Sequence, residues 1–67
     1  MRWTRHSHGG GLPDYESDTG HKVMQFRNAV GTPWRLERPV ELPAPLDEVY
    51  SWHRTLREAK AVAARDV

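Results

Sequence analysis

The chain has 67 residues, of which 37% are hydrophobic and 28% are charged, and its formal net charge is +1. A chain of this length forms one domain with a small core. Its near-neutral net charge does not support nonspecific electrostatic binding to nucleic acid. The absence of cysteine excludes disulfides and thiolate zinc sites. No signal peptide is recognisable, and no apolar run approaches the roughly 18 residues that span a membrane, so we expect a cytoplasmic protein.

The first predicted strand covers residues 1–7. Trp3 and Thr4 are residues that favour strands, and the basic residues Arg2 and Arg5 flank them. Three glycines at 9–11 end this strand, and the following Pro13 and Asp14 are typical of a turn. Residues 15–17 are compatible with an extended segment that leads into a turn at residues 18–20, but they are not counted as a strand.

The second and third strands are predicted at residues 21–28 and 34–42, where apolar side chains recur with a period of two. In the second strand we expect Met24 and Phe26 to point into the core. Apolar side chains also share one face of the third strand: Trp34, Leu36, Val40 and Leu42. Pro39 lacks the N–H that a central strand donates, so this strand lies at an edge or ends near Arg38.

A C-terminal helix at residues 55–66 is the strongest secondary-structure signal. Thr55 and Glu58 have the spacing of a capping box, alanine and lysine follow, and Arg65 lies in the last turn. Because Trp52 lies on the same helical stripe, an alternative start near Leu46 stays open. Either start places Trp52 over the sheet.

These elements predict an α+β domain in which a three-stranded antiparallel sheet packs against one C-terminal helix. The sheet is expected to contribute an apolar face of six side chains: Trp3, Met24, Phe26, Trp34, Leu36 and Val40. The helix is expected to cover that face with Trp52, Leu56, Ala59 and Ala63.

The sequence shows no pattern typical of an enzyme. The serines are not part of a nucleophile motif, and no glycine loop of a nucleotide-binding type is present. His6 and His8 lie on one side of the first strand and would form a metal site with His21 or Asp14. Histidines beside glycines near an N-terminus are usually exposed, so we predict no metal, no cofactor and no catalytic residue, with His6 and His8 left open.

Nucleic-acid binding through the exposed face of the sheet is the first functional hypothesis. A three-stranded sheet can enter a DNA major groove, where Arg and Gln side chains contact base edges. The candidate residues on or near that face are Arg2, Arg5, Gln25, Arg27 and Arg35. Glu37 and Glu41, on the outer face of the third strand, would repel phosphate.

Protein binding is the alternative hypothesis. Three Trp, two Tyr and one Phe exceed what so small a core buries, and an exposed Trp near Arg is typical of an interface hot spot. Trp3 and Trp52 are the candidates. An open sheet also leaves unpaired edge strands that can pair with another copy. The sequence therefore predicts a small non-enzymatic accessory protein that binds nucleic acid or, alternatively, a protein partner.

The run from Arg54 to Ala61, RTLREAKA, resembles the start of the closing helix in small β-β-β-α proteins of actinobacteria and their phages. It is also similar to the arm-site DNA-binding domain of tyrosine integrases and, more distantly, to that of plant ethylene-response factors. In those DNA binders the outer face of the sheet contacts DNA and the helix packs behind it. The resemblance implies a phage origin and DNA binding, although the integrase-type sheet is markedly more basic than this one.

Overall fold

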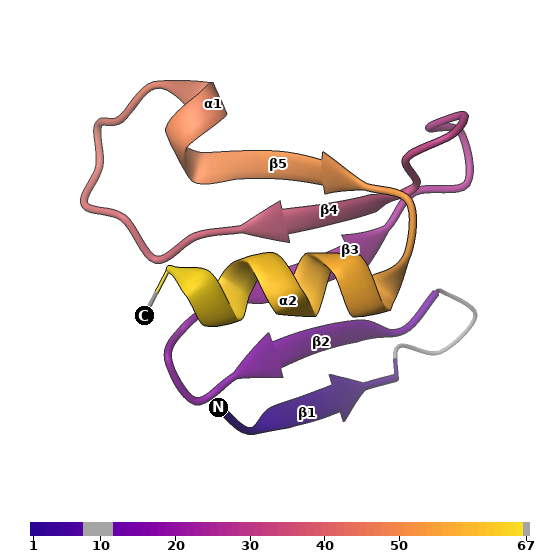
Figure 1. Cartoon of the computed structure of the whole chain (residues 1–67), viewed down its shortest axis with the longest axis horizontal. Coiled ribbons are helices and arrows are strands. Elements are labelled where there is room, and N and C mark those ends of the chain that lie inside the picture. The colour runs from indigo at the N-terminus through magenta and orange to yellow at the C-terminus, as the bar shows by residue number, and fades with distance from the viewer. Residues whose placement is uncertain (8–11, 67) are drawn as a thin grey trace.

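A five-stranded antiparallel sheet forms one layer of the protein, and a C-terminal helix lies across one of its faces (Figure 1). The computed structural model describes residues 1–7 and 12–66. Its elements are, in chain order, β1 (Trp3–His6), β2 (Asp14–Ser17), β3 (Lys22–Gln25), β4 (Trp34–Glu37), α1 (Leu46–Val49), β5 (Tyr50–His53) and α2 (Leu56–Arg65). Neither helix in the described part of the chain has the length and apolar character that crossing a membrane requires.

Each strand pairs with the next one along the chain, so the sheet is a simple meander. Short connections favour this order because antiparallel neighbours need only a tight turn. The turn between β2 and β3 contains Gly20 at φ 88°, a backbone conformation that other residues rarely adopt.

The core lies between the sheet and α2. Val23 of β3 and Leu36 of β4 are paired in register and are fully buried, as are Ala59 and Ala63 of α2. The two alanines let the helix approach the sheet closely. Around this centre pack partly buried apolar side chains: Trp3, Tyr15, Trp34, Leu56 and Val62.

The α+β class, the antiparallel sheet and the C-terminal helix are confirmed, but the prediction of three strands is wrong because the sheet has five. The predicted strands at 1–7, 21–28 and 34–42 correspond to the shorter β1, β3 and β4. Residues 14–17 pair on both sides and form β2. The other unpredicted strand, β5, falls where the sequence has a helical stripe.

The helix does not run from Leu46 to the C-terminus. Leu46–Val49 forms a single turn, α1, which ends where the Tyr50 N–H donates to the Leu46 carbonyl. The chain then becomes extended and pairs with β4, which places Trp52 in a strand opposite Arg35. Pairing with β4 satisfies the backbone of a segment rich in residues that favour strands, and this gain outweighs the local helical pattern.

The face assignment of β3 is the second correction. Met24 and Phe26 were expected in the core, but Val23 is the residue that packs there, and Met24 is 37% exposed on the opposite face. Side chains of β3 alternate between the two faces as expected, but the face that carries Val23 is buried and the face that carries Met24 is exposed. Pairing of Val23 with Leu36 sets this orientation because directly paired residues share a face of the sheet. Val40, also expected in the core, lies beyond the end of β4 and is exposed.

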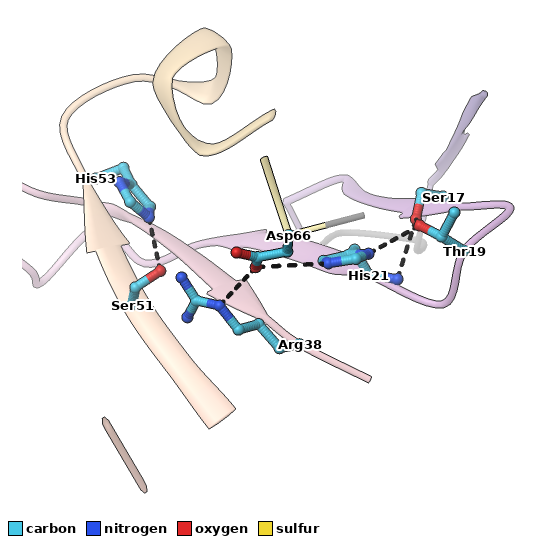
Figure 2. Close-up of polar contacts among 7 residues, drawn as sticks. All are labelled: Ser17, Thr19, His21, Arg38, Ser51, His53 and Asp66. Carbon is cyan, nitrogen blue, oxygen red and sulfur yellow. Dashed lines mark hydrogen bonds and ion pairs between the residues drawn. The ribbon is translucent and has the colours of Figure 1, made fainter. Parts of the chain in front are cut away.

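The join between β5 and α2 is stabilised by polar contacts. The Thr55 hydroxyl caps α2 by accepting the Glu58 N–H at 3.0 Å, as the capping pattern predicts. The Glu58 carboxylate lies 3.8 Å from His53 Nδ1. Figure 2 shows the contact on the other side of the ring, where His53 Nε2 lies 2.7 Å from the Ser51 hydroxyl. These contacts fix the angle at which the helix leaves the sheet.

The other end of α2 is held by Asp66 (Figure 2). Its carboxylate accepts a hydrogen bond from Arg38 Nε at 2.7 Å and lies 3.7 Å from Nε2 of the buried His21. The other ring nitrogen of His21 contacts the Thr19 hydroxyl at 2.8 Å, which in turn contacts the Ser17 hydroxyl at 2.8 Å. This chain of contacts ties the end of the helix to the β2–β3 turn and to the end of β4.

Candidate functional site

The face of the sheet opposite α2 is covered by no helix among the described residues, and we call it the open face. Strand register places two rows of side chains on it. One row is Thr4, Glu16, Lys22, Glu37 and Tyr50. The other is His6, Asp14, Met24, Arg35 and Trp52. The β1–β2 half of the open face is therefore polar, whereas the β4–β5 half carries aromatic side chains.

The most distinctive feature of the open face is the environment of Arg35. Its guanidinium carbon lies 4.6 Å from the centre of the Phe26 ring and 4.3 Å from the centre of the Tyr50 ring. Its Nη2 donates to the Met24 sulfur at 3.5 Å, and the Phe26 ring meets the Trp52 ring edge-on at 5.4 Å. We call these five residues, Met24, Phe26, Arg35, Tyr50 and Trp52, the Arg35 site. Two rings thus hold the cation in a fixed position.

Among the described residues, the guanidinium of Arg35 has no strong hydrogen-bond acceptor. Its Nε is buried without a hydrogen-bond partner, and no carboxylate of a described residue lies within 4.0 Å of the guanidinium. Arg38, by contrast, has the Asp66 carboxylate at 2.7 Å. Burying an arginine without an anionic partner costs stability, and the ring contacts offset only part of that cost. Arg35 is therefore suited to pairing with an anionic group from another molecule.

Two hollows adjoin the Arg35 site. One, of about 510 Å³, lies between Arg35, Tyr50, Trp52 and the start of α1 at Leu46 and Asp47. The second, of about 440 Å³, continues from Tyr50 and Leu46 along the segment that joins β4 to α1. Trp52 is 45% exposed and Leu46 is 76% exposed. The two hollows share Leu46 and Tyr50, and exposed apolar side chains beside a hollow are typical of a binding site.

The five residues proposed for nucleic-acid contact do not gather on the open face. Arg35 is the one that a strand places there. Arg5 and Gln25 alternate onto the side that carries α2, because Arg5 pairs with Tyr15 and Gln25 with Trp34. Arg2 precedes β1 and lines a hollow with Thr4, His6 and Glu16 at the β1 end of the open face, far across the sheet from Arg35 on β4. Arg27 follows β3. The expected basic surface is therefore not formed by these residues.

Among the strand residues on the open face, acidic side chains outnumber basic ones. The strands place Asp14, Glu16 and Glu37 there against the two cations Lys22 and Arg35. A phosphate backbone is attracted by clustered cations and repelled by carboxylates. This distribution does not favour the nucleic-acid hypothesis.

The two tryptophans proposed for protein contact differ in position. Trp3 lies on the α2 side of the sheet, half-buried, with the Lys60 ammonium 5.6 Å from its ring centre. Trp52 lies on the open face, opposite Arg35 in the β4–β5 pair. Sequence reasoning missed Tyr50 and assigned Phe26 to the core. The alternation of Tyr50 and Trp52 about Ser51 was the signal for an aromatic strand face.

Of the histidines proposed as metal ligands, His21 contacts Asp66 and Thr19, and His6 contacts one carboxylate. His6 Nε2 lies 3.5 Å from the Glu16 carboxylate. His8 lies outside the described residues. Within residues 1–7 and 12–66, no three histidine or carboxylate side chains come close enough together to hold a metal ion.

No protein-family model matches the chain, and neither the curated proteins nor the solved structures contain a match to it. The resemblance to phage β-β-β-α proteins and to integrase arm-site domains thus stays a prediction.

Proposed function

We propose that this protein is a non-enzymatic protein-interaction module that binds a segment of a partner protein at the Arg35 site. The observation that supports this proposal most strongly is a guanidinium that contacts two aromatic rings, has no carboxylate of a described residue within 4.0 Å, and lies opposite a half-exposed tryptophan. Trp, Tyr and Arg are the residue types that contribute most to the free energy of protein–protein binding. The Arg35 site combines all three.

The chemistry of the site favours one kind of partner segment. A carboxylate from Asp, Glu or a chain terminus would pair with the two Nη groups of the Arg35 guanidinium, because Nε is buried, and a planar two-point hydrogen bond is the geometry that arginine prefers. An apolar side chain beside that carboxylate would occupy the 510 Å³ hollow against Trp52 and Leu46. Since the rings of Phe26 and Tyr50 already hold the guanidinium, little side-chain entropy is lost on binding.

A protein partner is favoured over nucleic acid by charge. The carboxylates of Asp14, Glu16 and Glu37 lie on the same face as the Arg35 site. A peptide with one carboxylate avoids them, whereas a phosphate backbone would run past several of them. Nucleic-acid binding is therefore an alternative outcome of the test.

The test selects binding peptides from a random peptide library displayed on phage. We expect the selected sequences to carry Asp or Glu next to a large apolar residue. Trp52→Ala and Arg35→Lys should each weaken binding about 30-fold, which corresponds to the roughly 2 kcal/mol of a hot-spot side chain. Arg35→Lys keeps the charge but loses the planar fork. Val30→Ala, at a residue that is 96% exposed in the β3–β4 loop, is the matched control and should bind normally.

Circular dichroism of each variant establishes that the fold is retained. Selected peptides that bind wild type and Trp52→Ala equally well would refute the proposal, as would a selection without preference for acidic residues. A short single-stranded oligonucleotide that binds tightly, with an affinity that falls steeply with salt, would instead support the nucleic-acid hypothesis.

A further inference from the structure

The sheet has two edge strands, β1 and β5, and they differ in how accessible they are. An exposed edge presents unpaired backbone N–H and C=O groups that can pair with another strand. At β5, α1 lies beside the start of the strand, and the Tyr50 N–H is already bonded to the Leu46 carbonyl (Figure 1). At β1, no described segment lies outside the strand (Figure 1). β1 is therefore the more open edge.

The backbone groups that β1 presents follow from its pairing with β2. The Asp18 N–H donates to the Arg2 carbonyl at 3.0 Å. Because bonded and non-bonded residues alternate along an antiparallel strand, Thr4 also faces β2, while Trp3 and Arg5 direct their N–H and C=O groups outward. No described residue bonds to these outward groups. β1 thus offers two adjacent bonding positions to an incoming strand.

We propose that β1 pairs antiparallel with β1 of a second copy of this chain, about a two-fold axis at Thr4. In this register Trp3 lies opposite Arg5 of the second copy, and each such pair exchanges two backbone hydrogen bonds. A register shifted by one residue would place the outward N–H and C=O groups of one copy opposite residues of the other copy whose N–H and C=O groups point toward β2. A shift that pairs Arg5 with Arg5 would oppose like charges, which destabilises a strand pair.

In this register the side chains of one β1 strand are complementary to those of the β1 strand in the second copy. On the α2 side, the exposed Arg5 of each copy lies beside the half-buried Trp3 ring of the other, which is the arrangement of a cation–π pair. On the open face, the two Thr4 side chains meet at the axis, and paired threonines are favourable there. Arg2 lies opposite His6 of the second copy, and His6 already has the Glu16 carboxylate at 3.5 Å.

Pairing in this way produces one continuous antiparallel sheet from the two copies. The two-fold axis is perpendicular to the sheet, so both α2 helices lie on one side and both Arg35 sites on the other. The dimer would eliminate the exposed β1 edge and present two partner sites in the same direction. It requires no partner protein and goes beyond the proposed function.

The experiment measures the mass of the protein by sedimentation equilibrium over a concentration series. Wild type is expected to be a dimer. Thr4→Lys and Thr4→Glu each oppose like charges at the axis and should raise the dissociation constant about tenfold, whereas a mixture of the two variants should restore a dimer of mixed composition. Val30→Lys makes the same charge change away from β1 and should leave the dimer intact.

A second variant tests the backbone contribution. Arg5→Pro removes an outward N–H without removing a bond to β2, a substitution that edge strands tolerate, and it should give a monomer with a normal circular dichroism spectrum. Wild type that stays monomeric at all concentrations, or a dimer that survives Arg5→Pro, would overturn the proposal. So would a mixture of Thr4→Lys and Thr4→Glu that fails to restore pairing. Peptide binding by the monomeric Arg5→Pro variant tests the Arg35 site separately.

Discussion

Replacing Val23 by alanine is expected to destabilise this protein far more than replacing the larger Met24. Val23 is 0% exposed and packs against Leu36 beneath Ala59 and Ala63, whereas Met24 is 37% exposed on the open face. Val23→Ala removes two buried methylene equivalents, about 1.6 kcal/mol of transfer free energy, and the cavity left behind raises the cost to about 2–3 kcal/mol. Met24→Ala should cost less than about 1 kcal/mol.

A loss of this size is most of the stability of so small a domain, for which about 3–5 kcal/mol is typical. The melting temperature of Val23→Ala should therefore fall by roughly 10–20 °C. Urea unfolding followed by tryptophan fluorescence gives the free energies of unfolding. Val30→Ala makes the same chemical change at a residue that is 96% exposed and should have almost no effect.

A larger loss in Met24→Ala than in Val23→Ala would refute the face assignment of β3. It would also place Met24 in the core, as the sequence pattern by itself suggested, and would remove the open face as described.

Two further predictions concern the β2–β3 turn and the C-terminal end of α2. Gly20→Ala should cost about 2 kcal/mol and more than Gly31→Ala, because both glycines have positive φ but only a Cβ at Gly20 would meet the Pro39 Cβ, at 3.1 Å; equal losses would contradict this account. Asp66→Asn removes the carboxylate that Arg38 Nε contacts at 2.7 Å and should lower the free energy of unfolding by about 1 kcal/mol. That loss should be smaller in high salt, and a salt-independent loss would argue against the ion pair.

Two residues of the candidate site could be selected from the sequence, but their proximity could not. Arg35 and Trp52 were both selected from the sequence, but for different hypotheses, one as a nucleic-acid contact and the other as a protein contact. The structure places them opposite each other on β4 and β5, where they form one site with Tyr50 and Phe26. Their proximity depends on a strand pairing between segments that are distant in sequence, so neither residue's local pattern contained it.

The C-terminal helix was determined by the sequence alone. Its start depends on a hydroxyl at Thr55 that bonds to the backbone of Glu58, and its length depends on a run of helix-forming residues. These are interactions between residues close in the chain, so their energies can be assigned without knowing the rest of the fold. The alternating faces of β3 and β4 are local in the same sense.

The tertiary structure alone decided which face of β3 enters the core and whether residues 50–53 are helix or strand. Val23 and Met24 are both apolar, so alternation defines two faces without identifying the inner one; the pairing with Leu36 makes that choice. Trp52 fits a helical stripe and a strand face equally well. It lies in a strand because hydrogen bonds to β4, from residues far away in the sequence, stabilise the extended form over the helical one.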